Sequence, residues 1–146
     1  MILAAAARGP AEQIWLRRAV SSAYYALFHG LAKSCADILV GAGEIEANTR
    51  AWAITYRALD HGAARTACRN VTEDTFPKGI LDFARNFIAL QEQRHAADYD
   101  PRLQLTRAIV DVEIDRARTV LIGLEDLSPA DRRAFAAHVL FRRRTA

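Results

Sequence analysis

Cysteines and long apolar runs are both scarce in this 146-residue chain. The two cysteines, Cys35 and Cys68, lie far apart and are not part of a paired Cys/His spacing that would indicate a zinc site. We therefore expect both to be reduced core residues. No apolar run is long enough to cross a bilayer, and the first residues lack the layout of a secretory signal. These features favour a soluble, cytoplasmic protein without a membrane partner.

Signatures of cofactor-dependent chemistry are also missing. The histidines are scattered, at His29, His61, His95 and His138, and no HExxH pattern occurs. The chain has neither a glycine-rich phosphate loop nor a Gly-x-Ser-x-Gly turn. We therefore expect no metal site and no cofactor, and we expect neither nucleotide hydrolysis nor esterase chemistry.

What the chain does have is the composition of a folded domain. Apolar residues make up 51% and charged residues 25% of the chain, values typical of globular proteins and not of disordered ones. Apolar positions recur every three or four residues, and no long stretch alternates between apolar and polar residues. We predict an all-α, antiparallel bundle of about five helices, forming one domain over residues 1–146 with a frayed lead-in or short turn over residues 1–10.

Proline, glycine and capping residues set the expected helix boundaries. The predicted helices run from Pro10 to near Gly41, from Asn48 or Thr49 through Cys68 with a kink or break at Gly62, from Pro77 to near Tyr99, from Pro101 with Asp100 as its N-cap, and from Ser128 onward. The second helix is expected to carry Trp52, Tyr56, Leu59 and Ala63 on one side, and the fourth to begin its apolar stripe at Leu103.

Positive charge is concentrated at the C-terminal end. The net charge is only +3, but the chain from residue 132 onward has no acidic residue and five arginines: Arg132, Arg133, Arg142, Arg143 and Arg144. Such a cluster suits either phosphate contacts or a solvated last helix whose arginines complement the helix dipole. We favour the solvated helix.

The most informative stretch is residues 80–101. Its apolar residues form one helical face and lead directly into polar positions on the same face, at Gln91, Arg94 and Asp98. The first helix has a matching polar stripe four residues apart, at Ser21, Tyr25 and His29. We predict that the two stripes face each other, either as buried pairs that fix the helix register or across a cleft.

Two strings in this chain resemble the HEPN superfamily of small helical-bundle proteins. They are LRRAVSSAYYALFHGLA, from Leu16, and LQEQRHAADYDP, ending at Pro101. The match is to a branch with an AYYAxFH first helix and an RxxADY element. The resemblance implies a bundle of four to five helices, often a homodimer, with the polar part of the third long helix near the two-fold axis.

Many HEPN proteins are metal-independent ribonucleases that use an arginine and a histidine spaced Arg-x4–6-His. Several act as toxins beside a small nucleotidyltransferase antitoxin, which can modify a nearby tyrosine. Arg94 matches the family arginine, but Tyr99, Asp100 and Pro101 stand where the histidine would follow. The chain therefore departs from the family pattern at the residue that would transfer protons.

Three hypotheses follow. The first is a non-catalytic or degenerate HEPN-type module that binds RNA or protein in a toxin–antitoxin or nucleotidyltransferase-linked system. Its expected binding residues are Ser21, Tyr25, Gln91, Asp98 and Tyr99, and Tyr99 is a candidate for nucleotidylation. The second is an active metal-independent ribonuclease toxin with Arg94, His95 and His29 as catalytic groups. The third is a structural adaptor in which Arg94 and Asp98 are buried and paired.

Overall fold

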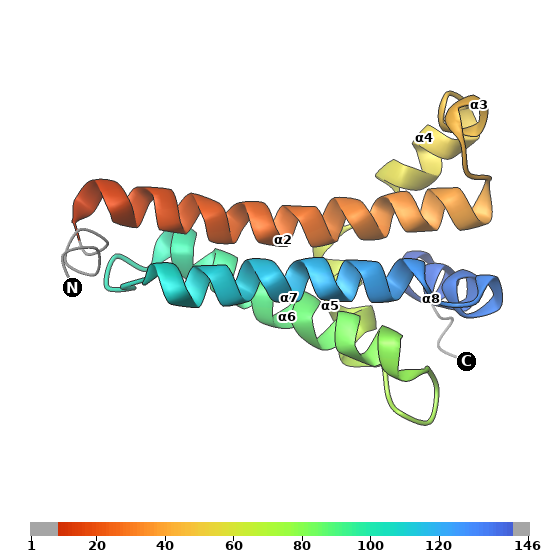
Figure 1. The fold of residues 1–146 in the computed structure, drawn as a ribbon. Helices are drawn as coiled ribbons and strands as arrows, with labels where there is room; N and C mark the ends of the chain where they lie inside the picture. The colour runs from red at the N-terminus through yellow and green to blue at the C-terminus, as the bar shows by residue number, and fades with distance from the viewer. Residues whose placement is uncertain (1–8, 142–146) are drawn as a thin grey trace.

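The computed structural model describes residues 9–141, which form helices joined by short connections (Figure 1). Residues 1–8, most of the expected lead-in, lie outside the described part, as do Arg142, Arg143 and Arg144. None of the helices in residues 9–141 combines the length and apolar character needed to cross a membrane.

Between residues 9 and 141 the chain forms seven helices and no strand, which confirms the all-α class and exceeds the predicted five helices. They are α2 (Pro10–Leu39), α3 (Glu44–Ala47), α4 (Arg50–Arg57), α5 (His61–Arg69), α6 (Lys78–Tyr99), α7 (Arg107–Glu125) and α8 (Pro129–Leu140).

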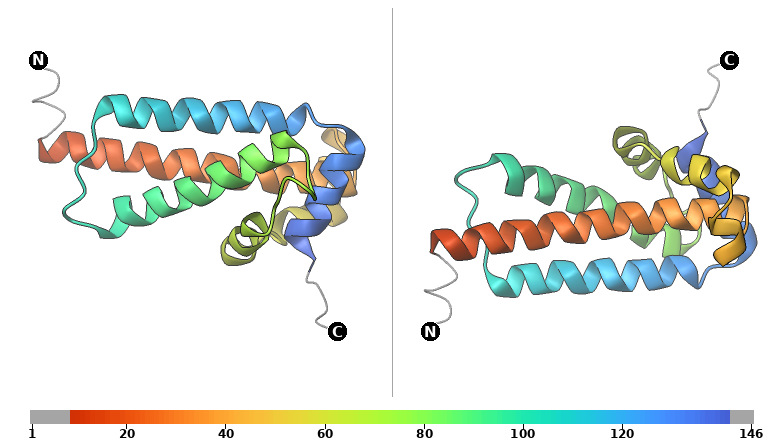
Figure 2. Two further views of the ribbon diagram at one scale, coloured as in Figure 1. Left: turned by 90° about the horizontal axis from the view of Figure 1, so that it is seen from below. Right: turned by 90° about the horizontal axis from the view of Figure 1, so that it is seen from above.

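Helix α2 is the axis of the bundle. The long helices α6 and α7 pack against it and against each other, and α6 runs antiparallel to both (Figures 1 and 2). Helix α8 packs against the C-terminal part of α2, and α5 fills the angle between α6 and α8. Helix α4 also packs on α2. Helices α2 and α6 make the most extensive contact of any pair of helices, and this contact brings their polar stripes together.

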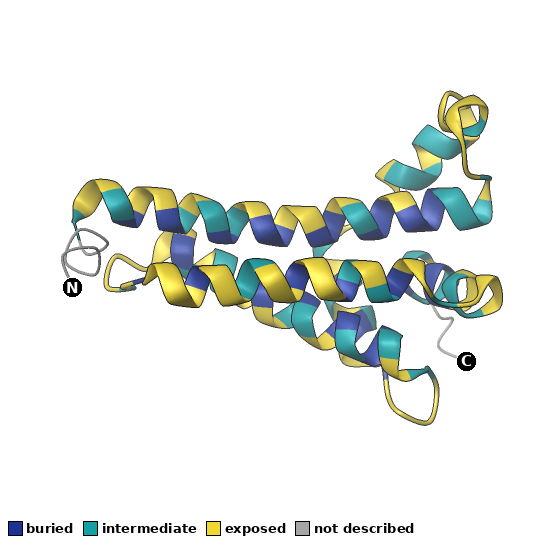
Figure 3. Ribbon diagram, in the orientation of Figure 1, coloured by how far each residue is buried: buried dark blue, intermediate teal, exposed yellow. Residues whose placement is uncertain are grey.

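The core forms where the sequence predicts it. The apolar stripe of α6 is entirely buried, as are the facing residues of α2 and α8, and the buried positions line the inner faces of the helices (Figure 3). The largest fully buried side chains are Tyr24, Leu27, Leu31, Phe83, Phe87 and Phe135. Each such side chain contributes about 1.5–3 kcal/mol by leaving water. Cys35 and Cys68 are both free and buried, as expected.

The predicted second helix is in fact two helices, and the break lies before Gly62 and not at it. Helix α4 ends at Arg57, and α5 begins at His61 with Asp60 as its N-cap, whose Oδ2 accepts a hydrogen bond from the Ala63 amide at 2.8 Å. Because the helical phase restarts at residue 61, Ala63 is exposed, contrary to prediction. The break places His61 at the start of a helix that packs against α6.

The start of α7 was also predicted wrongly. The helix begins at Arg107, and the Thr106 hydroxyl caps it by accepting from the Ile109 amide. Asp100 instead accepts from the Arg102 amide within the loop, and Leu103 precedes the helix. Residues 100–105 therefore form a non-helical connection with a turn at residues 101 and 102.

Two side chains of α2 hold this connection in place. Gln13 donates to the Leu105 carbonyl at 2.8 Å and accepts from the Leu105 amide at 2.9 Å, so that one side chain satisfies both backbone groups of a buried residue. Arg17 donates to the carbonyls of Ala97 and Leu103 at 2.8 and 2.7 Å. These backbone contacts replace the helical hydrogen bonds that an earlier start of α7 would have made.

Substituting Gln13 by leucine is expected to lower the free energy of unfolding by about 2 kcal/mol, because two buried backbone groups of Leu105 lose their partners. Gln104→Leu is the matched control, since Gln104 is exposed in the same loop. Urea unfolding at equilibrium measures both variants. Equal stability of Gln13→Leu and Gln104→Leu would contradict this account of the loop.

Candidate functional site

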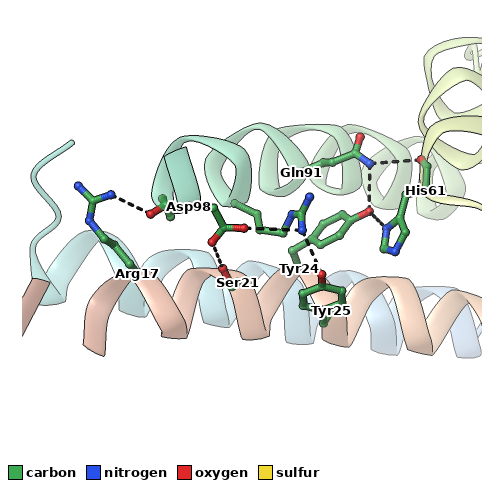
Figure 4. Close-up of polar contacts among 9 residues, drawn as sticks. Arg17, Ser21, Tyr24, Tyr25, His61, Gln91 and Asp98 are labelled. Carbon is green, nitrogen blue, oxygen red and sulfur yellow. Dashed lines mark hydrogen bonds and ion pairs between the residues drawn. The ribbon is translucent and has the colours of Figure 1, made fainter. Parts of the chain in front are cut away.

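The polar stripes of α2 and α6 meet at two points, as the helical spacing predicts. Ser21 donates from Oγ to Asp98 Oδ1 at 3.0 Å, and Arg94 donates from Nη1 to Tyr25 Oη at 3.0 Å (Figure 4). The helices are antiparallel, so the earlier residue of one stripe meets the later residue of the other. Both contacts lie at the surface of the bundle and not in its core.

Arg94 occupies an unusual environment at the centre of this site. Its guanidinium carbon lies 5.3 Å from the ring centroid of Tyr24 and 5.6 Å from that of Tyr25, within cation–π range. Its ion pair with Asp98 is long, at 3.7 Å, and contributes little at this exposure. Its Nε is buried and has no hydrogen-bond partner in the described structure. The side chain is 24% exposed, so the cation is positioned but remains accessible.

His61 is the site residue that the sequence analysis missed. Its Nδ1 lies 2.6 Å from Tyr24 Oη (Figure 4). Its ring stacks on Phe28 with centroids 3.8 Å apart and planes 12° apart. The one signal for it was Asp60, a good N-cap residue that would place His61 at the start of a helix. A helix predicted to run through this position concealed that signal.

The hydrogen-bond network favours one tautomer of His61. Arg65 has only donors, so the oxygen of Gln91 must accept from it, at 3.1 Å. The Gln91 amide nitrogen then donates to Tyr24 Oη at 3.0 Å and to the His61 carbonyl at 3.2 Å. Because Tyr24 Oη accepts from Gln91, its own proton is available to His61 Nδ1, and in this arrangement the imidazole proton lies on Nε2.

Electrostatics agrees with this assignment. Burial, and next the positive charge of Arg94, lower the pKa of His61 from its ordinary value. Burial raises the pKa of Tyr24 to about 12. Both groups are therefore neutral at pH 7. In the tautomer with the proton on Nε2, the phenol donates to Nδ1 and neither nitrogen of His61 offers an open lone pair to act as a base.

The other predicted residues lie around this centre. His29 is exposed, with its Nδ1 2.7 Å from Tyr56 Oη, and its ring lies 6.1 Å from that of Tyr25. His95 and Tyr99 are exposed on α6, and their rings contact each other at 4.9 Å. Tyr99 is 70% exposed. The structure thus groups Ser21, Tyr25, Gln91, Arg94 and Asp98, with His29 beside them and Tyr99 at the edge.

A surface pocket of about 450 Å³ opens beside Arg94. It is lined by side chains of α5 and α6: Arg65, Gln91, Glu92, Arg94, His95 and Ala96. Arg65 is paired with Glu92 at 2.7 Å, which leaves Arg94 as the more available cation. The lining suits an anionic group approached from solvent. Among the described residues, no group of three or more His, Cys, Asp or Glu side chains is placed to hold a metal ion.

Comparison with known proteins adds no assignment: no family model matches the sequence, and neither the curated proteins nor the solved structures contain a significant match. The resemblance to HEPN proteins therefore rests on the two sequence strings.

We expect the imidazole of His61 to titrate with a midpoint below 6.5, the ordinary histidine value. Because the folded pKa lies below the unfolded one, the unfolded chain takes up the proton first as the pH falls. The contribution to stability is complete above about pH 6.5 and is lost as the pH falls through the folded pKa. Histidine NMR titration, with the His61→Gln variant to assign the signal, measures the midpoint. A midpoint at or above 6.5 would show that the network is oriented differently.

Proposed function

We propose that this chain is a HEPN-type helical domain that binds RNA through Arg94 without cleaving it, as an interaction module of a toxin–antitoxin or nucleotidyltransferase-linked system. The observation that carries the proposal is the state of Arg94. Its guanidinium is held over two tyrosine rings, is accessible from a pocket, and has one buried N–H without a partner in the described structure.

A phosphate is the ligand that fits this arrangement. A guanidinium forms strong, often bidentate hydrogen bonds with phosphate oxygens. Tyr25 and the long contact to Asp98 occupy Nη1, and Nε is buried, so Nη2 is the nitrogen that remains for a ligand. The tyrosine rings hold the guanidinium in place beforehand, which reduces the entropy lost on binding. Ser21 donates a hydrogen bond to the carboxylate of Asp98 and so partly compensates the negative charge that lies close to Arg94.

The protonation of the site favours binding over cleavage. Metal-independent RNA cleavage needs a base for the 2′-hydroxyl and an acid for the leaving oxygen. His61 is half-buried beside Tyr24, which occupies its Nδ1, and the favoured tautomer has the proton on Nε2. His29 is engaged with Tyr56. Positions 99–101, where the family pattern has its histidine, are Tyr, Asp and Pro.

Arg94→Gln is expected to weaken binding of single-stranded RNA by about tenfold and to reduce the salt dependence of binding by about one phosphate contact. Arg85→Gln is the matched control, because Arg85 is an exposed arginine on the same helix and outside the pocket. Fluorescence anisotropy at several salt concentrations measures both. The proposal fails if wild-type protein does not bind RNA, or if the two variants bind equally well.

A metal-independent ribonuclease is the second candidate, and one observation favours it. Two histidines lie near Arg94. The pKa of His61 is lowered by burial and next by the charge of Arg94, and His95 lines the same pocket as Arg94. This function would show itself as RNA cleavage by purified protein in excess chelator, lost in Arg94→Gln and in His61→Gln or His95→Gln. Such cleavage would replace the binding proposal.

We further propose that the protein is a homodimer. Near the start of α2, Ile14 and Trp15 are 53% and 66% exposed, and Tyr99 at the facing end of α6 is also exposed. Burying adjacent large apolar side chains is a common driving force for self-association. The exposure of Tyr99 would also make it accessible to a nucleotidyltransferase partner.

The double variant Ile14→Ser/Trp15→Ser is expected to shift the protein from dimer to monomer in sedimentation velocity. The matched control is Val112→Ser/Ile122→Ser, which removes two exposed apolar residues from α7. A monomeric wild-type protein, or a dimer unaffected by the α2 variant, would contradict this interface.

A further inference from the structure

Four aromatic rings form a continuous row from α2 to α4. The ring of Tyr25 lies 6.1 Å from that of His29, His29 lies 6.0 Å from Tyr56, and Tyr56 lies 5.2 Å from Trp52. The planes of successive rings differ by only 27°, 15° and 22°. Pairs of residues four apart on two packed helices produce this alignment. We call these four residues the aromatic row.

Stacking within the row leaves part of each ring face uncovered. Centroid distances of 5–6 Å between near-parallel rings are those of offset stacking, in which a neighbour covers only part of each face. Tyr25 is 39% exposed, His29 is exposed, and Tyr56 and Trp52 are half-buried. Two hydrogen bonds restrain the row: one joins His29 Nδ1 and Tyr56 Oη at 2.7 Å, and Trp52 Nε1 donates the other to Asp37 at 2.9 Å.

The row begins at the cation of the site. Tyr25, its first member, accepts the hydrogen bond from Arg94 and lies under the Arg94 guanidinium. Its far end lies on α4, and residues 50–69, which form α4 and α5, contain four arginines and a single acidic residue, Asp60. Proteins that bind single-stranded nucleic acids combine positive charge along the backbone with aromatic side chains on which bases stack. The aromatic row, Arg94 and the arginine-rich segment provide both features.

We propose that the aromatic row is a stacking platform for unpaired bases of single-stranded RNA whose backbone phosphate is held by Arg94. This inference rests on the proposed RNA binding and adds to it a base-dependent contribution. Stacking tolerates any base, since every base has a π face. Positive charge along α4 and α5 favours a polyanion over a second copy of this chain, which would bring the same arginines.

The test compares two fluorescein-labelled probes of equal length: a 12-nucleotide oligoadenylate and an abasic ribose-phosphate oligomer. They have the same number of phosphates, so only base contacts distinguish them. Wild-type protein is expected to bind oligoadenylate at least about tenfold more tightly. His29→Ala and Tyr56→Leu are expected to reduce this preference and to leave binding of the abasic probe unchanged. Phe141→Ala removes an exposed aromatic outside the row and serves as control.

A second readout does not depend on substitutions in the row. In a Trp15→Phe background, Trp52 is the remaining tryptophan, and its emission should be quenched by oligoadenylate and not by the abasic probe. Equal affinity for both probes with unchanged Trp52 emission would overturn the stacking platform and leave phosphate binding intact. Failure to bind either probe would overturn the proposed function and the platform with it. Quenching by a protein partner alone would assign the row to protein recognition and refute our proposal.

Discussion

The contact on which the site depends is the Arg94 guanidinium lying against the rings of Tyr24 and Tyr25. One part of the guanidinium remains in contact with water. On the other part, the electron-rich faces of the two rings replace the water. Antiparallel packing of α2 and α6 provides this environment, since it brings the second turn from the end of α6 to the middle of α2. The core beneath, built on Phe83, Phe87 and Leu27, keeps the two helices in register.

Arg94 also shapes its neighbours. Burial of the His61 ring, and next the positive charge of Arg94, lower the pKa of His61. A series of hydrogen bonds runs from Arg65 through Gln91 and Tyr24 to His61 Nδ1. The imidazole packs on Phe28. In the favoured tautomer its lone pair at Nδ1 accepts a hydrogen bond from Tyr24 Oη and is therefore not available to act as a base. In the proposed function, the arrangement that holds the cation in place would therefore serve phosphate binding without proton transfer.

The sequence was sufficient to predict the long helices, the buried stripe of α6 and the meeting of the two polar stripes, because each depends on helical periodicity. It was insufficient wherever tertiary contacts override local signals. Asp100 and Pro101 have the chemistry of a helix start, but Gln13 and Arg17 hold the following residues as a non-helical loop. His61 was missed because its partners, Tyr24 and Gln91, lie 37 and 30 residues away. The aromatic row likewise joins two helices whose relative placement periodicity does not give.

The most direct test of the central claim is NMR observation of the Arg94 Nε–H resonance while single-stranded RNA is added in the presence of chelator. This N–H is part of the guanidinium that is proposed to hold the phosphate and has no other partner in the described structure, so phosphate binding at the neighbouring Nη2 should move its resonance. The account predicts a saturable shift of this resonance with the RNA recovered intact. RNA binding that leaves the Arg94 resonance in place, or RNA recovered as fragments, would contradict it.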